Sequence, residues 1–235
     1  MRRSLRAGPR PGRGRVRRRR AGAGRLPDAR YRCRIPYHYD GSTALIVVDV
    51  QNDFADPVGS LYVRGGEAVP ALVNAEIAAA VAAGAAVVYT QDWHPPVTPH
   101  FQKDGGIWPV HCVAHTWGAE LHPDLRVAGP TVFKGVDGED GYSGFTVRDT
   151  RTGQRHGTDL EERLRAAQVT TVVIAGLATD YCVRETALDA VAKGFTTVVL
   201  TDAIRAVDLA PGDGERAQQA MADAGVVLQG GTSPA

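Results

Sequence analysis

The most constraining feature of the sequence is an alternation, from residue 44 to residue 228, of short apolar runs with longer helical segments. The first run, ALIVVDV at 44–50, is apolar and β-branched throughout, as a strand buried inside a parallel sheet requires. Strands that alternate with helices predict a mainly parallel sheet with helices on both faces, a doubly wound, Rossmann-like three-layer α/β sandwich. We expect strands at 44–50, 85–90, 131–133, 170–176, 196–200 and 226–228, and helices at 69–83, 160–168, 179–194 and 214–225.

The alternating region predicts one domain at 41–230, between an N-terminal tail at 1–40 and a short C-terminal tail at 231–235. Residues 1–34 hold fourteen arginines and one acid, Asp28, so they carry about +13 of a net charge of +1 and leave about −12 elsewhere. Because this Arg/Gly/Pro/Ala segment is of low complexity and cannot bury a core, we expect it to be disordered.

Three interpretations of the arginine-rich tail compete. It could bind nucleic acid or anionic surfaces through its charge, act as a targeting segment, or be translated sequence upstream of the true start. No aromatic residue lies among residues 1–30, which weakens single-strand binding by base stacking. We therefore do not expect nucleic-acid binding to be the tail's function.

Composition and missing motifs exclude several classes of protein. No apolar run approaches the ~20 residues of a membrane span. The three cysteines, Cys33, Cys112 and Cys182, are odd in number and widely spaced, which argues against a disulfide framework and fits a reducing cytoplasm. The absence of GxGxxG, GxxxxGK[ST] and GxSxG motifs predicts no nucleotide cofactor and no α/β-hydrolase serine. The sequence does not decide between a monomer and a homo-oligomer.

Polar residues follow four of the predicted strands. Asp49 closes the first strand, Asp92 follows the second, Lys134 follows the third, and residues 179–182 follow the fourth. Ligands of doubly wound folds bind at the carboxyl ends of the strands. These four segments are therefore expected to converge on one edge of the sheet and form a site.

Cys182 is the first candidate for a nucleophile. It lies in the first turn of a predicted helix, and a helix N-terminus favours the thiolate. Cys112, beside His111 in WPVHCV, is a rival, and a buried structural cysteine is a further alternative. Asp49 could serve as the base, because burial at an apolar strand end raises a carboxyl pKa, and Lys134 could supply positive charge.

The loop QDWHPPVTPHF at 91–101 is a candidate metal site. Asp92 and His94 are two positions apart and can face the same side of an extended segment, and His100 and His111 follow. One carboxylate and up to three imidazoles suit zinc, iron or manganese, although a polar loop without metal remains an equal alternative. The other histidines show no partner pattern and are expected at the surface: His38, His115, His122 and His156.

Six motifs occur in an order that resembles a known family. They are DVQNDF (49–54), QDWHPPVTPHF (91–101), WPVHCV (108–113), VFKG (132–135), GYSGF (141–145) and ATDYCVRETALDA (178–190). From about residue 43 to residue 229 the chain resembles the isochorismatase-like cysteine hydrolases, and among them the nicotinamidases (pyrazinamidases). The resemblance implies the isochorismatase-like hydrolase fold.

The resemblance also implies roles for individual residues. It implies a catalytic triad of Asp49, Lys134 and Cys182, and one divalent metal ion held by Asp92, His94, His100 and His111. It implies a pyridine-binding set of Phe54, Trp108 and Tyr142. It further implies a cis peptide at Leu177–Ala178, with the backbone N–H groups of Ala178 and Cys182 forming an oxyanion hole.

The implied activity is hydrolysis of nicotinamide to nicotinate and ammonia in NAD salvage, with pyrazinamide as a further substrate. One alternative is another superfamily hydrolase acting on a carbamoyl compound or isochorismate; such relatives generally lack the Asp-x-His metal set. A second alternative is a catalytically dead scaffold that binds partners through the arginine-rich tail. Deletion of residues 1–34 would separate that alternative from an enzyme, because an enzyme would keep its turnover.

Overall fold

A computed structural model describes residues 37–230 and shows one six-stranded sheet as the centre of the domain. The strand order is β3-β2-β1-β6-β7-β8, and all five neighbouring pairs are parallel. This arrangement confirms the predicted doubly wound α/β fold. The strands are β1 (Thr43–Val48), β2 (Ala86–Asp92), β3 (Thr131–Lys134), β6 (Thr171–Leu177), β7 (Thr196–Arg205) and β8 (Val227–Gln229).

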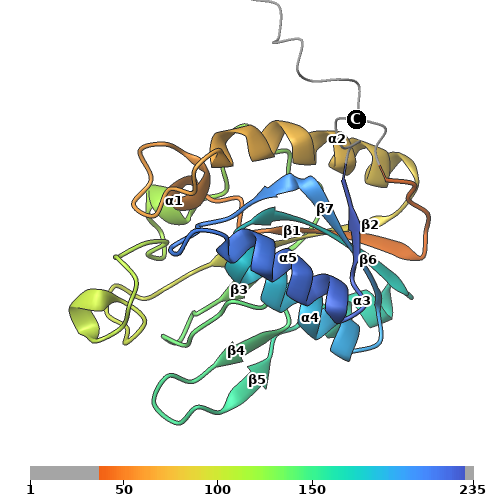
Figure 1. Ribbon diagram of the computed structural model, residues 1–235. Coiled ribbons are helices and arrows are strands. Elements are labelled where there is room, and N and C mark those ends of the chain that lie inside the picture. Colours follow the sequence, from red (N-terminus) through yellow and green to blue (C-terminus); the bar gives the residue numbers. More distant parts are fainter. Residues whose placement is uncertain (1–36, 231–235) are drawn as a thin grey trace, which may run out of the picture. The chain divides into compact units, whose positions relative to one another are not determined.

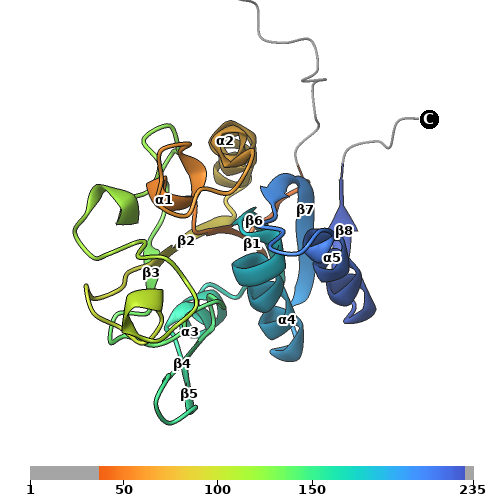
Figure 2. The same ribbon diagram turned by 60° about the vertical axis from the view of Figure 1, so that its left-hand side comes forward.

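Helices cover both faces of this sheet. Figures 1 and 2 show α2 (Val69–Ala82) on one face, and α3 (Leu160–Ala166), α4 (Arg184–Ala192) and α5 (Asp213–Asp223) on the other. A short helix, α1 (Asn52–Ala55), follows β1.

Two apolar clusters lie between the three layers because successive side chains of a strand point to opposite faces. Leu45 of β1 packs into the cluster that contains Ile77 of α2. Its neighbour Ile46 packs into the other cluster, which contains Leu164 of α3. All six residues of β1 are buried. Burial on both faces explains why the strand reads as a continuous apolar run rather than an alternating one.

Two regions differ from the sequence prediction. The segment expected as a single helix at 179–194 begins with a π-helical turn, Thr179–Val183, in which the Val183 N–H donates to the Ala178 carbonyl (3.0 Å), before α4. A separate antiparallel pair, β4 (Thr146–Arg148) and β5 (Arg155–Gly157), was not predicted. Its strands read TVR and RHG and lack the apolar run by which the strands of the central sheet were predicted.

The N-terminal boundary of the domain also differs. Tyr37 N–H and the Tyr39 hydroxyl each donate to the Glu76 carboxylate of α2 at 3.0 Å, and Tyr39 is buried. These residues therefore pack with the domain, although the tail was predicted to extend to residue 40. The rest of that tail, and the predicted tail at 231–235, lie outside the described residues. None of the helices within 37–230 combines the length and the apolar character that a membrane crossing requires.

Candidate active site

The candidate site lies where the order of strands in the sheet reverses, between β1 and β6. The chain moves from β1 outward to β2 and β3 on one side, and from β6 outward to β7 and β8 on the other. The crevice at the carboxyl ends of β1 and β6 is therefore the topological switch point, where ligands of this fold class bind. Asp49 follows β1 there, and the cis peptide Leu177–Ala178 closes β6, as the resemblance implied.

Lys134, the last residue of β3, lies at the centre of the site. Its side chain is fully buried, and its Nζ lies 2.7 Å from Asp49 Oδ2, 2.9 Å from Asp92 Oδ1 and 3.6 Å from Cys182 Sγ. Burial alone would lower the pKa of Lys134, but the Asp49 and Asp92 carboxylates outweigh it and raise that pKa well above its usual range. Lys134 is thus a buried, permanent cation and not a solvated surface charge.

Asp49 is completely buried beside this cation. The Thr90 hydroxyl donates to Asp49 Oδ1 at 2.6 Å, while Lys134 holds the other oxygen. Burial raises the pKa of Asp49 to about 6, even though the Lys134 charge opposes the shift. The predicted direction is therefore confirmed, and this carboxylate is suited to accept and return a proton near neutral pH.

Cys182 lies in the π-helical turn, with 6% of its surface exposed. Burial raises the pKa of its thiol well above the ordinary value, with Lys134 opposing the shift. The stabilisation of the thiolate expected from the helix start does not determine this pKa, because desolvation dominates. The sulfur and an Asp49 carboxylate oxygen lie within 4.8 Å of each other, so Asp49 is near enough to act as its base.

Cys112, the rival nucleophile, lies elsewhere. Its side chain is fully buried and its Sγ lies 3.8 Å from the Gly118 carbonyl. Burial also raises the pKa of this thiol well above its usual value. It does not line the cavity into which Cys182 opens, so the geometry favours Cys182.

Three histidines and a carboxylate gather next to Lys134. Ring nitrogens of His94, His100 and His111 lie within 4.8 Å of one another. Asp92 Oδ2 lies 3.9 Å from His94 Nε2 and 4.0 Å from His111 Nε2. Three imidazoles and one carboxylate form a donor set that suits a divalent transition metal.

The surroundings of these rings fit a metal ion. His94 is 1% exposed, yet neither of its ring nitrogens has a hydrogen-bond partner within residues 37–230. Buried polar atoms without a partner are rare and destabilising. Burial lowers the pKa of His94 to about 4, which keeps the ring neutral, the form that binds metal. At Gly135 (φ +73°) an added Cβ would lie 2.5 Å from the His94 ring, so only glycine permits this approach.

The other two histidines have their second nitrogen fixed. His111 Nδ1 lies 2.7 Å from the Pro109 carbonyl oxygen, and His100 Nδ1 lies 2.7 Å from Asp140 Oδ1. Metal-binding histidines generally donate their remaining N–H to a carbonyl or carboxylate in this way. Asp140 was not identified from the sequence.

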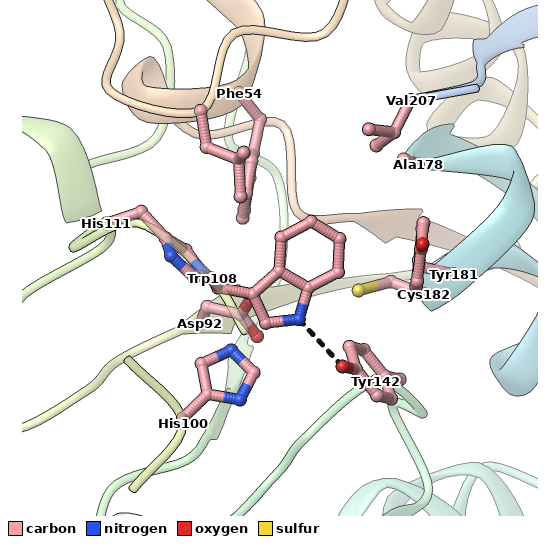
Figure 3. A pocket seen from close by; sticks show the side chains of 11 residues that line it. Phe54, Asp92, His100, Trp108, His111, Tyr142, Ala178, Tyr181, Cys182 and Val207 are labelled. Carbon is pink, nitrogen blue, oxygen red and sulfur yellow. Dashed lines mark hydrogen bonds and ion pairs between the residues drawn. The ribbon is translucent and has the colours of Figure 1, made fainter. Parts of the chain in front are cut away.

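A cavity with about 370 Å³ of empty space, which includes the solvent at its opening, separates His100 and His111 from Cys182. Figure 3 shows His100 and His111 on one side, the Cys182 sulfur on the other, and Phe54 and Trp108 between them. The Trp108 indole N–H donates to the Tyr142 hydroxyl at 2.8 Å. The cavity lining includes all three predicted aromatic residues and Ala178, and it adds three residues that the sequence did not indicate: Leu61, Tyr181 and Val207.

Sequence reasoning also missed the buried polar side chains that brace this site. Gln51 Nε2 donates to the Asp92 carbonyl, and the Asp92 N–H donates to Gln51 Oε1, both at 2.8 Å. Asp53 Oδ2 accepts the Cys112 N–H at 2.7 Å, next to His111. Gln51 and Asp53 both belong to the DVQNDF motif. The sequence shows that this motif is polar but does not show which backbone groups its side chains bind.

One further prediction was wrong. His122 was expected at the surface, but it is 8% exposed and its Nδ1 accepts the Asp124 backbone N–H at 3.2 Å.

Residues 43–230 match the sequence model of the isochorismatase domain. The chain belongs to the isochorismatase family. The polar side chains at the switch point are thus found on the fold expected for this family.

Within the isochorismatase family the chain resembles nicotinamidases and pyrazinamidases. It is 37% identical over 204 residues to the nicotinamidase of Escherichia coli (strain K12), covering 79% of this chain and 93% of that protein. A solved pyrazinamidase of Pyrococcus horikoshii in complex with zinc has a TM-score of 0.72 and 40% identity, covering 81% of this chain and 99% of that one. PnC1 from L. infantum in complex with nicotinate has a TM-score of 0.74 and 35% identity, covering 83% and 96%. The resemblance stated from the motifs is confirmed.

The burial of Lys134 predicts a large effect on stability. Lys134→Met leaves the Asp49 and Asp92 carboxylates buried without their cation, which should lower the free energy of unfolding by about 3–5 kcal/mol. Lys193→Met is the control, because the Lys193–Glu161 ion pair (2.6 Å) lies near solvent and its loss should change stability by less than about 1 kcal/mol. Urea unfolding measures both. Equal effects of the two substitutions would contradict the central role of Lys134.

Proposed function

We propose that this protein is a metal-dependent cysteine amidohydrolase that converts nicotinamide to nicotinate and ammonia. The observation that carries the proposal is a cavity in which Cys182 faces Asp92, His100 and His111 between aromatic walls. The buried Lys134–Asp49 pair lies directly behind the Cys182 sulfur. A flat aromatic amide suits such a cavity, because aromatic side chains can pack against its ring. Similarity to a nicotinamidase of known structure and to PnC1 in complex with nicotinate supports the same substrate.

The first half of the reaction uses Asp49 as a base. As Cys182 Sγ forms a bond to the carboxamide carbon, its proton passes to the Asp49 carboxylate, and the carbonyl oxygen becomes an oxyanion. The backbone N–H groups of Ala178 and Cys182 are proposed to stabilise that oxyanion. When the C–N bond breaks, Asp49 gives the proton to the departing nitrogen, which leaves as ammonia and a thioester remains.

The second half reverses the proton transfers. Asp49 takes a proton from a water molecule, whose oxygen attacks the thioester carbon, and the C–S bond then breaks to release nicotinate. Cys182 regains its proton. Throughout, Lys134 stabilises the Asp49 carboxylate and the charge that develops on sulfur, since its Nζ lies within 3.6 Å of both groups.

We further propose that Asp92, His94, His100 and His111 hold one zinc, iron or manganese ion. When bound, the ion would supply an electrophilic position for the pyridine nitrogen and so hold the ring. Phe54, Trp108 and Tyr142 would contact the ring faces and edges. In this proposal the histidine side of the cavity binds the substrate ring, and Cys182 attacks the carboxamide.

The proposed reaction also implies a metabolic role and a second substrate. Nicotinate formed from nicotinamide would serve NAD salvage in the cytoplasm, and pyrazinamide, which has a similar ring and the same carboxamide, should also be hydrolysed. The histidine cluster argues against a carbamoyl amidase or an isochorismatase, because such relatives generally lack it.

Ammonia release from nicotinamide tests the reaction directly. The wild-type protein should release ammonia and nicotinate in equal amounts. Cys182→Ala should lower kcat by about a thousandfold or more, because the nucleophile is lost. Cys112→Ala, which removes the other buried thiol, should retain activity. Failure of the wild type to release ammonia would refute the proposed function.

Metal removal tests the role of the histidine cluster. Exhaustive chelation, followed by elemental analysis, should yield a protein with strongly reduced turnover that one equivalent of zinc, iron or manganese restores. Cys182→Ala should still bind one equivalent, because its substitution leaves the four proposed ligands intact. Undiminished turnover after complete removal would retain the amidase and reject the metal requirement.

The raised pKa of Asp49 predicts an acid limb in the pH profile. Asp49 accepts the Cys182 proton only as a carboxylate, and its pKa is about 6. Therefore kcat/KM for nicotinamide should be half its maximum at about pH 6, level off about one unit higher, and fall about tenfold per unit well below pH 6. Asp49→Asn should remove the activity at every pH. A profile that stays flat to pH 4 would exclude Asp49 as the base.

A further inference from the structure

Asp140 links a metal-site histidine to a surface arginine. Its Oδ1 lies 2.7 Å from His100 Nδ1, and its Oδ2 accepts a hydrogen bond from an Arg148 guanidinium nitrogen, also at 2.7 Å. The side chains become more exposed along this path, from 4% for His100 through 16% for Asp140 to 51% for Arg148. The carboxylate thus lies at the boundary between the buried site and the solvent.

The backbone of Asp140 is also fixed. Asp140 and Arg148 form an isolated antiparallel bridge, with N–H to carbonyl hydrogen bonds of 2.9 Å and 2.8 Å. Arg148 is the last residue of β4, and it pairs with Arg155 of β5. The β4–β5 hairpin therefore holds both the backbone and the carboxylate of Asp140.

We propose that Asp140 is a positioning residue for the metal site, which fixes His100 in the orientation and tautomer that leave Nε2 free to bind the ion. This inference rests on the proposed metal site. With the proton on Nδ1 and directed at Asp140, only Nε2 carries a lone pair. The β4–β5 hairpin takes part through Arg148, which orients the carboxylate.

Other contacts of His100 do not perform this task. Its ring stacks on His94, with centroids 4.6 Å apart and an angle of 21° between the planes, and it lies 6.1 Å from the Tyr142 ring. These contacts restrict the tilt of the ring but do not select which nitrogen carries the proton. His111 has a backbone carbonyl for that purpose, whereas His100 depends on one side chain.

Zinc affinity measures this role without reference to turnover. The zinc Kd is determined by competition with a chromophoric chelator for the wild type, Asp140→Ala, His100→Ala and the double variant. Asp140→Ala should raise the Kd about 10–100-fold. The double variant should bind zinc no more weakly than His100→Ala alone, because Asp140 acts through His100.

Two further variants control for folding and for charge. Asp140→Asn keeps an oxygen acceptor for His100 and should bind zinc more tightly than Asp140→Ala, and it replaces that variant if the alanine protein does not fold. Asp159→Asn removes a carboxylate from the exposed Asp159–Arg163 pair (2.6 Å) and should leave the Kd unchanged. Thermal unfolding of the metal-free proteins verifies that each variant is folded.

The outcomes separate this inference from the proposed function. A wild-type protein that binds zinc, with an unchanged Kd in Asp140→Ala, overturns the role of Asp140 alone. Losses that add in the double variant also overturn it, since they place the effect of Asp140 outside His100. A wild-type protein that binds no zinc refutes the metal site itself and this inference with it.

Discussion

The ammonium group of Lys134, shared between two buried carboxylates, is the interaction on which the rest of the site depends. The register of β2 and β3 pairs Asp92 with Lys134, and β1 lies on the other side of β2, so the sheet itself brings Asp49 to the same cation. None of these charges is stable alone at such burial. Two carboxylates against one ammonium leave excess negative charge, which a cation beside Asp92 would offset. Lys134 thereby joins the proposed catalytic residues to the candidate metal site.

Burial also sets the resting state of the nucleophile. The thiol of Cys182 keeps its proton because desolvation outweighs the nearby Lys134 charge. Oxidation and metal capture proceed through the thiolate, so a neutral thiol beside the candidate metal site would react less readily in both ways. The proposed attack must then be coupled to proton transfer, and Asp49, with a pKa of about 6, has the basicity for that transfer. The same low-polarity environment protects the sulfur and makes the base effective.

The sequence predicted those parts of the site that strand ends determine. Asp49 and Lys134 stand directly after or at the end of apolar runs, so the parallel sheet predicted their meeting. The protonation state of Cys182 was not predictable, because it depends on burial by segments far away in the chain. Asp140 was missed for a similar reason. Its partners are His100, in the loop after β2, and Arg148, in the β4–β5 hairpin. The strands of this hairpin, TVR and RHG, lack an apolar run, and their pairing is set by tertiary contacts.

The motif at residues 49–54 braces the end of β2 and the following loop, which together carry the proposed metal ligands. Asp49 is the proposed base, Gln51 binds both backbone groups of Asp92, and Asp53 binds the backbone beside His111. Backbone groups buried in a loop need such partners, because no strand or helix supplies them. One short segment therefore positions the proposed base and, through backbone hydrogen bonds, the proposed ligands opposite it. A change in the backbone path of residues 49–54 would therefore move the proposed base and the proposed metal ligands together. The geometry of proposed metal binding thus depends on the same segment as that of proposed bond breaking.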